Sequence, residues 1–419
     1  MTTPLLAIDG GTPAIREPLP GGGLGVELID DAEIEAATRV LRSKRMFRFG
    51  NGDECQTLEA EAAAWQGVQY AVFVNSGTSA LVCALAGLGI GPGDEVIVPG
   101  YTYIATGAAV VAVGAVPVIA EIDDSLGLDP ADVAQKITPY TRAVIPVHMQ
   151  GVPCRLAQLK AITDTHGIAL VEDCCQAVGA SYRGKAAGAW GQASAWSLNY
   201  FKAITCGEGG VMFTDDPTVL ERASFQADPA FPMWQGINAW RTPPFSRDCF
   251  RGNEITAAIA RVQLEKLPRV LAHCRGLKHR LLVQLAPPRH YALQHVDDPD
   301  GEIGMSFAML AHTPELALRM SDALGAEGLP VGTAYNKAGF PDRHVYAYWD
   351  SILTQTGATA AGYPWRDPTY HGAVRYAEDI CPRTLDLLTR ALRLSLHLNL
   401  TEAHIDQMAE AINKVDGGL

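Results

Sequence analysis

Short apolar runs alternate with segments of helical periodicity between residues 72 and 214, and this alternation limits the folds open to the chain more than any other feature. The apolar runs lie at 72–74, 95–98, 116–120, 142–147, 168–172, 193–198 and 211–214. Helical patterns separate several of them, at 79–88, 102–113 and 155–165. Short runs that are apolar throughout are typical of strands buried on both faces of a mainly parallel sheet. The sequence therefore predicts an α/β domain with a mainly parallel seven-stranded sheet.

The segments on either side of this alternation predict three parts. Residues 1–29 are rich in glycine and proline and have no sustained period, so we expect an arm that lies over the surface or over a partner subunit. Residues 30–272 are predicted to form the large domain, which ends in a linking helix at 254–272. Residues 273–419 are predicted to form a smaller α+β domain.

Two further helices are predicted from caps and periodicity. A helix capped by Asp30 or Asp31 should end near Arg42 and turn one apolar face to the core, made of Ile34, Ala37, Val40 and Leu41. The last helix should begin after Thr401 and bury Ile405, Met408, Ile412 and Val415.

The charge and cysteine content exclude several classes of function. The 419 residues carry a net charge of −13, which argues against a nucleic-acid partner or an anionic membrane surface. Nine cysteines include no CxxC pair, and the adjacent Cys174 and Cys175 cannot form an ordinary disulfide. No secretory signal or membrane span is apparent. The sequence therefore predicts a cytoplasmic protein with free thiols.

A glycine turn after the first run predicts an anion site. Asn75-Ser76-Gly77-Thr78 leads directly into a helix, whose free N–H groups suit a phosphate. The alternative is plain helix capping by Ser76 or Thr78.

Other polar and aromatic residues follow later runs, and parallel sheets bind ligands beyond the carboxyl ends of their strands. Tyr103 can stack on a planar ring or pack in the core. His148 can bond a ligand oxygen or be a satisfied core histidine. Asp173 can bind a cation or a protonated ring nitrogen, or cap a helix. The spacing around Cys174 disfavours a metal site, and none is predicted.

One lysine follows the run at 193–198, between apolar neighbours and a glycine-rich turn. Partial desolvation lowers the pKa of such an amine, and a neutral amine can form a Schiff base with an aldehyde. The alternative for Lys202 is a side chain that simply extends to solvent. Pyridoxal phosphate requires an anchor for its phosphate, an aromatic side chain that stacks on its ring, a carboxylate for its ring nitrogen and a lysine for its aldehyde. The residues after these runs, with the Ser197 hydroxyl and this lysine, match that set.

At this point the sequence resembles the fold-type I pyridoxal-phosphate enzymes, and most of all the DegT/StrS sugar aminotransferase family. The matching stretches are NSGTSAL, PGDEVIVPGYTYIAT, PVHMQG, VEDCCQAVGASYRGKAAG and SLNYFKAITCGEGGVMFTDD. The resemblance implies that Lys202 bonds covalently to the cofactor and that Asp173 pairs with its ring nitrogen. It also implies ring contacts from Gln176 and Tyr103, and phosphate contacts from Ser197, Gly77 and Thr78.

The chain departs from the family pattern before the linking helix. The family has Gly-x-Asn-x-Arg-Met-x-Glu there, and its asparagine reaches the phosphate across a dimer. This chain has Cys249 at the asparagine position, so Arg247, Arg251 or Asn253 is expected to make the cross-subunit contact instead.

The resemblance implies a homodimeric aminotransferase that moves nitrogen from an amino acid, glutamate or glutamine, to a ketone of a sugar nucleotide or cyclitol. His148 and Trp234 are candidate substrate contacts. A dehydratase or aromatising synthase of the same family and a non-catalytic regulatory homologue remain as alternatives. Family members that act as sugar dehydratases replace the lysine with histidine, so Lys202 favours transamination.

Overall fold

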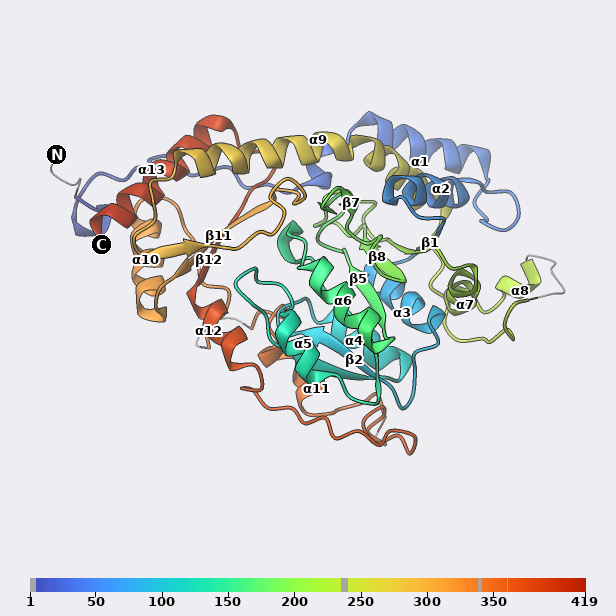
Figure 1. Ribbon diagram of the computed structural model, residues 1–419. Helices are drawn as coiled ribbons and strands as arrows, with labels where there is room; N and C mark the ends of the chain where they lie inside the picture. Colours follow the sequence, from blue (N-terminus) through green and yellow to red (C-terminus); the bar gives the residue numbers. More distant parts are fainter. Residues whose placement is uncertain (1–4, 235–239, 338–340, 360) are drawn as a thin grey trace.

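A seven-stranded sheet forms the centre of the molecule (Figure 1), in a computed structural model that describes residues 5–234, 240–337, 341–359 and 361–419. The strand order is β1-β9-β8-β5-β4-β2-β3. The strands are β1 (Tyr70–Val74), β2 (Glu95–Pro99), β3 (Val116–Ala120), β4 (Thr141–Val144), β5 (Ala169–Asp173), β8 (Ala193–Ser197) and β9 (Gly210–Thr214). Only β9 runs antiparallel to its neighbours in this sheet; the pairs from β8 to β3 are all parallel. The predicted mainly parallel sheet is confirmed.

Both faces of this sheet are buried, which explains why its strands are apolar throughout. Within β1, Val72 and Val74 join one apolar cluster, whereas Phe73 joins another on the opposite face. The helices around the sheet are α2 (Glu54–Gln66), α3 (Gly77–Gly87), α4 (Ala105–Val113), α5 (Pro130–Lys136), α6 (Leu156–His166) and α7 (Pro217–Ala227). A short hairpin of β6 (Ser181–Tyr182) and β7 (Lys185–Ala186) follows β5, and α8 (Phe231–Trp234) follows α7.

Helix α9 (Glu254–Gln284) runs along one side of the molecule beside α1 (Asp31–Ser43) and α2 (Figure 1). Its predicted end at residue 272 was wrong by 12 residues. The helix continues because buried positions recur at Cys274, Leu277 and Leu281, and it stops just before the Pro287-Pro288 pair.

Helix α1 buries a different side of its surface from the side that was predicted. Ala36 and Val40 are buried, and with Ala258 of α9 they form a small apolar cluster. Ile34 and Leu41 instead point outward and are 59% and 52% exposed. The predicted apolar face was therefore wrong at these two positions, because the helix is apolar on two sides and only one of them meets α9.

The C-terminal part contains a three-stranded antiparallel sheet in the order β10-β11-β12. Its elements are β10 (Tyr291–Leu293), β11 (Ser306–Ala311), α10 (Pro314–Ala326), η4 (Tyr346–Tyr348), α11 (Asp350–Leu353), α12 (Pro382–Arg390), β12 (Ala391–Ser395) and α13 (Glu402–Gly418). Thr401 caps α13 as predicted, and the expected apolar residues of that helix are buried.

The N-terminal arm lies against the chain's own C-terminal part. Over its described residues, 5–29, it contains two short turns of 3-10 helix, η1 (Ala7–Asp9) and η2 (Gly25–Leu28). The backbone N–H groups of Ala7 and Ala14 each donate to the buried Glu327 carboxylate at 2.8 Å. Farther along, Gly25 N donates to the carbonyl oxygen of Lys202 at 3.1 Å. The arm thus forms hydrogen bonds both with the C-terminal part and with the loop that contains Lys202.

All nine cysteines are free thiols. Over the residues with described coordinates, no helix is both long and apolar enough to cross a membrane.

Candidate active site

Lys202 lies in a tight loop between β8 and β9. Backbone bonds from Leu198 N to Gly209 O and from Tyr200 N to Gly207 O, both 2.9 Å, close this loop. Gly207 has φ +86°, a conformation that favours glycine. The half-buried Lys202 lines a cavity of about 170 Å³; its other lining residues are Gln150, Gln176, Phe201, Ala203, Met305 and His344.

Asp173 ends β5 and is only 4% exposed. Its Oδ1 accepts from Cys175 N at 3.0 Å and its Oδ2 from Thr106 Oγ1 at 2.8 Å. No helix starts at Asp173, so its carboxylate closes a local turn and does not cap a helix. Within the described ranges no cationic side chain forms an ion pair with it, although burying an uncompensated carboxylate is costly. This position suits a cationic ligand atom.

The turn after β1 forms a narrow cradle next to Ser197. Ser76 is the N-cap of α3, because its Oγ accepts from Ser79 N at 3.1 Å. Gly77 and Thr78 therefore take the first two helical positions, where N–H groups have no partner within the helix. A Cβ on Gly77 would lie 2.7 Å from Ser197 Cβ and 2.8 Å from Cys175 Sγ, so only glycine fits here. Free N–H groups and a hydroxyl beside this glycine suit a phosphate.

The Cys175 thiol belongs to the same environment. Burial first, and then the negative charge of Asp173, raise the pKa of Cys175 well above its ordinary value. The thiol is therefore neutral at physiological pH and does not compete with a phosphate or with Asp173 for positive charge. Cys175 N bonds the Asp173 carboxylate, and the Cys175 thiol lies beside Gly77 and Ser197, so Asp173 and the Gly77 turn adjoin the end of β8.

Two glutamines line the lysine cavity, and Tyr103 lies beside His344, which also lines it. The Tyr103 ring is 50% exposed and lies 5.3 Å from the His344 ring, centroid to centroid. Gln176 Oε1 accepts from Gln150 N at 3.1 Å, and Gln150 has a left-handed φ of +55°. His344 Nδ1 lies 2.7 Å from Asp342 Oδ1. Burial opposes ionisation of Asp342, but its bonds from His344 outweigh burial, and its pKa lies below the ordinary value.

Thr106, Thr102, Gln150, Asp342 and His344 were not identified from the sequence. Thr106 lies 67 positions from the carboxylate that it contacts, and no local pattern indicates such a contact. His344 reaches the site from the C-terminal part, through the bond from Thr102 N to His344 O at 2.8 Å. In the sequence, residues 335–368 are rich in aromatic side chains, which is typical of a loop near a site or an interface.

His148 lies in the interior, with no exposed surface. Its Nδ1 accepts from Cys154 N at 3.1 Å, so Nε2 carries the proton and donates to Glu172 Oε2 at 3.3 Å. Glu172 also accepts from the N–H groups of Gly188, Trp190 and Gly191. His148, Glu172 and Cys174 have the residue types and closeness of a metal site, but these bonds already satisfy the carboxylate and the imidazole. The position of His148 is that of a core histidine.

The segment before α9 does not reach the lysine cavity within one chain. Asn253 Oδ1 caps α9, accepting from Ile255 N and Thr256 N. Arg251 Nε donates to Cys249 Sγ at 3.3 Å, and its Nη1 lies 3.7 Å from Asp228 Oδ2. Arg247 is exposed.

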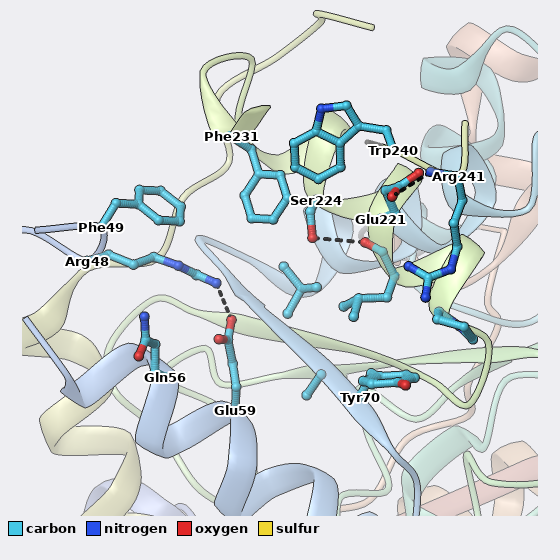
Figure 2. A pocket seen from close by; sticks show the side chains of 14 residues that line it. Arg48, Phe49, Gln56, Glu59, Tyr70, Glu221, Ser224, Phe231, Trp240 and Arg241 are labelled. Atoms are coloured by element: carbon cyan, nitrogen blue, oxygen red, sulfur yellow. Dashed lines mark hydrogen bonds and ion pairs between the residues drawn. The ribbon is translucent and has the colours of Figure 1, made fainter. Parts of the chain in front are cut away.

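Trp234 belongs to a different part of the surface. Its ring stacks on Phe49 at 6.2 Å and meets Phe47 edge-on at 5.2 Å. Phe49 also lines a separate cavity of about 390 Å³ between β1, α2 and α7. Figure 2 shows Arg48 and Glu59 facing each other in that cavity, 2.5 Å apart, with Phe231 and Trp240 above them. Arg48 and Glu59 are therefore paired with each other, and the buried Glu221 carboxylate accepts from the backbone N–H groups of Arg241 and Thr242. None of the predicted site residues lines this cavity.

Comparisons with known proteins agree with this geometry. The sequence profile described as the DegT/DnrJ/EryC1/StrS aminotransferase family matches residues 27–339. The chain is 35% identical over 353 residues to an L-glutamine:2-deoxy-scyllo-inosose aminotransferase of Streptomyces kanamyceticus, covering 79% of this chain and 80% of that protein. It is 49% identical over 194 residues to a dTDP-3-amino-3,4,6-trideoxy-alpha-D-glucose transaminase of Streptomyces venezuelae, covering 46% of this chain and 50% of that protein.

Two solved structures are similar over nearly the whole chain. One is 3-amino-5-hydroxybenzoic acid synthase, with a TM-score of 0.77 and 27% identity over 96% of this chain and 99% of that one. The other is S. venezuelae DesV, with a TM-score of 0.76 and 30% identity over the same shares of the two chains.

Proposed function

Because the chain belongs to the DegT/DnrJ/EryC1/StrS aminotransferase family, whose members in general depend on pyridoxal phosphate, we propose that it binds this cofactor at Lys202. It then transfers an amino group from glutamine or glutamate to a ketone of a cyclitol or sugar nucleotide. One observation supports this most directly: Cys175, whose N–H bonds the buried Asp173 carboxylate, packs its thiol beside the Gly77 turn, which also meets Ser197 at the end of the strand before Lys202.

The residues predicted to bind the cofactor have roles that their surroundings support. Gly77, Thr78 and Ser197 would hold the phosphate, Tyr103 and Gln176 would contact the ring, and Asp173 would keep the ring nitrogen protonated. When bound, pyridoxal phosphate supplies an aldehyde that carries nitrogen and a ring that accepts the electron pair of a carbanion. Lys202 Nζ would move the proton at the substrate carbon as a general base and acid.

The acceptor is proposed to be a cyclitol ketone first and a sugar-nucleotide ketone second. The relative that aligns over most of both chains acts, by its name, on 2-deoxy-scyllo-inosose with L-glutamine as donor. The cavity at Lys202 is bordered by the amides of Gln150 and Gln176 and the imidazole of His344, which are suited to hydroxyl groups.

A second candidate is a dehydratase or aromatising synthase, which the likeness to 3-amino-5-hydroxybenzoic acid synthase favours. The two functions differ in their need for an amino donor. A transaminase produces one keto acid for each amine formed, whereas a dehydratase releases water without consuming the donor.

The proposed assembly is a cytoplasmic homodimer in which the partner subunit completes each site. The exposed Phe47 (39%) and Trp234 (42%) are consistent with a surface that a second copy covers. Arg247, Arg251 and the amide nitrogen of Asn253 are the candidates to reach the partner's phosphate.

The test is to reduce the purified holoenzyme with borohydride and map the labelled peptide. We expect the cofactor on Lys202, and we expect Lys202→Ala to lose both visible absorbance and turnover. Lys185→Ala is the matched control, because Lys185 is an exposed lysine that lies over the Trp190 ring. A colourless wild-type protein, or a label on Lys185, would contradict the proposal.

Donors and acceptors are then screened separately. With donor alone, the cofactor absorbance should change once and stop, and a cyclitol ketone should restore it. Restoration only by a sugar-nucleotide ketone would select the second acceptor class.

A further inference from the structure

The Asp173 carboxylate is held by two protein donors that point at different oxygens. Cys175 N reaches Oδ1 at 3.0 Å and belongs to the same turn. Thr106 Oγ1 reaches Oδ2 at 2.8 Å from the first turn of α4, and its residue is 1% exposed. Two donors in fixed directions set the plane of the carboxylate.

The number of available protons decides which group donates in the hydrogen bond between Thr106 and Asp173. An ionised carboxylate can only accept, and a threonine hydroxyl has one proton, so Thr106 must give its proton to Asp173. The 2.8 Å contact between Thr106 Oγ1 and Thr102 Oγ1 then requires Thr102 to be the donor. Thr102 is also 1% exposed. The relay runs from Thr102 to Thr106 to Asp173, and aligned hydrogen bonds in a dry interior strengthen one another.

The far end of the relay is attached to the substrate side of the site. Thr102 N donates to His344 O at 2.8 Å, and Ile104 N donates to Arg343 O at 3.0 Å. Between them lies Tyr103, whose ring meets the His344 ring. His344 in turn lines the cavity of Lys202. The two threonines therefore connect the wall of that cavity to the acid at the end of β5.

We propose that Thr106 is a positioning residue for Asp173 and that Thr102 orients Thr106, so that the relay fixes the carboxylate that pairs with the cofactor ring nitrogen. This inference rests on the proposed function, since it needs the cofactor. Thr106 acts only through Asp173.

The test compares Thr106→Val, which replaces the hydroxyl with a methyl group, and Thr106→Ser, which keeps the hydroxyl. Thr163→Val is the matched control: Thr163 is also 1% exposed and helical, but its hydroxyl donates to the carbonyl of Lys160 within its own helix. For each purified holoenzyme we would measure three quantities: the pH at which the visible cofactor absorbance changes, the cofactor Kd, and the single-turnover rate with amino donor.

We expect Thr106→Val to shift the absorbance titration and to lower the single-turnover rate about 10-fold or more, as for other residues that support a ligating group. Thr106→Ser should restore both, and Thr163→Val should change neither. If Thr106→Val does not fold, Thr102→Val replaces it and should shift the titration in the same direction by less.

Two failures can be told apart. A wild-type protein with no cofactor absorbance overturns the proposed function, and this inference with it. A wild type with normal absorbance and a Thr106→Val variant (or Thr102→Val in its place) that titrates and reacts like wild type overturns the relay alone. A Thr106→Ser variant no better than Thr106→Val would also overturn it, because a purely steric role would not depend on the hydroxyl.

Discussion

Asp173 and Lys202 come from the ends of neighbouring strands, β5 and β8, and are separated in sequence by the hairpin β6–β7. Within the part of the chain that the structure describes, Asp173 accepts from Cys175 N and Thr106 Oγ1, and the Lys202 side chain lines a cavity. The site can therefore serve a ligand that brings a protonated ring nitrogen to Asp173 and an aldehyde to Lys202.

At this scale we predict that Asp173→Asn keeps the fold but lowers turnover by at least about 100-fold, comparable to removing one preorganised electrostatic group. An amide cannot stabilise a protonated ring nitrogen as a carboxylate does. Steady-state turnover with a proven donor measures the loss, and circular dichroism reports the fold. Asp164→Asn, on the exposed side of α6, is the control and should be active. Near wild-type turnover in Asp173→Asn would refute the assignment.

The sequence could predict the residues that directly follow strands, because a parallel sheet collects them at one edge. Asp173, Gly77 and Lys202 are of this kind. Thr106 and His344 could not be predicted, since their contacts join segments that are distant in sequence. The burial of His148 also depended on tertiary contacts, because the carboxylate and backbone N–H that satisfy it come from β5 and Cys154.

At the scale of the elements, the N-cap of α9, Asn253, is also a candidate phosphate contact. Asn253 Oδ1 accepts two backbone N–H groups at 3.1 and 3.0 Å, and this bonding accounts for the residue without any phosphate. The cap and the phosphate hypotheses make different predictions for aspartate at this position, because aspartate is an equally good cap but would repel a phosphate.

We therefore predict that Asn253→Ala lowers the free energy of unfolding by about 1 kcal/mol, whereas Asn253→Asp leaves it nearly unchanged. Urea denaturation measures both. If Asn253 only caps the helix, the cofactor Kd of both variants should stay close to that of the wild type. A large rise in Kd for Asn253→Asp alone would instead identify Asn253 as a phosphate contact.

Most helices and strands could be predicted from the sequence, but the length of α9 and the buried face of α1 could not. All seven strands of the large sheet were found from short apolar runs, because both faces of the sheet are buried. The end of α9 was misplaced since nothing in its sequence marks a stop at 272. The exposed side of α1 was misplaced because periodicity cannot tell which of two apolar stripes meets the core.

At the scale of the whole molecule, Glu327 fastens the arm to the C-terminal part. Its fully buried carboxylate accepts from Ala7 N, Ala14 N and Lys414 Nζ, each at 2.8 Å. Burial opposes its ionisation, but the bond from Lys414 and the two backbone bonds outweigh burial and hold the pKa of Glu327 below its ordinary value of 4.5.

We predict that Glu327→Gln lowers the free energy of unfolding by about 3 kcal/mol at pH 7, because it leaves Lys414 buried without a counter-ion. A carboxyl group with a lowered folded pKa stabilises the protein above pH 4.5, and this contribution is lost as the pH falls through the folded pKa. The difference between wild type and variant should therefore shrink below pH 4.5. Glu410→Gln, at an exposed position of α13, is the control. A difference independent of pH would contradict this account.

We predict that the exposed apolar residues of α1, Ile34 and Leu41, lie in the interface of the proposed homodimer, so that charged substitutions there weaken the dimer. The double substitution Ile34→Glu and Leu41→Glu should raise the dimer dissociation constant, measured by sedimentation velocity over a dilution series, at least about 10-fold. Leu318→Glu is the control, since Leu318 of α10 is similarly exposed at 53%. Unchanged association of the double variant would place the interface elsewhere.

The length of α9 has a mechanical consequence. Its 31 residues extend about 46 Å and include Pro268. Leu264 and Leu267 of this helix pack in the apolar cluster of the large sheet, whereas Leu277 and Leu281 pack in that of the small sheet. The same helix thus contributes side chains to both apolar cores. Loss of either core removes a wall of the other, so the two should melt as a single cooperative unit, with coincident tryptophan-fluorescence and circular-dichroism transitions.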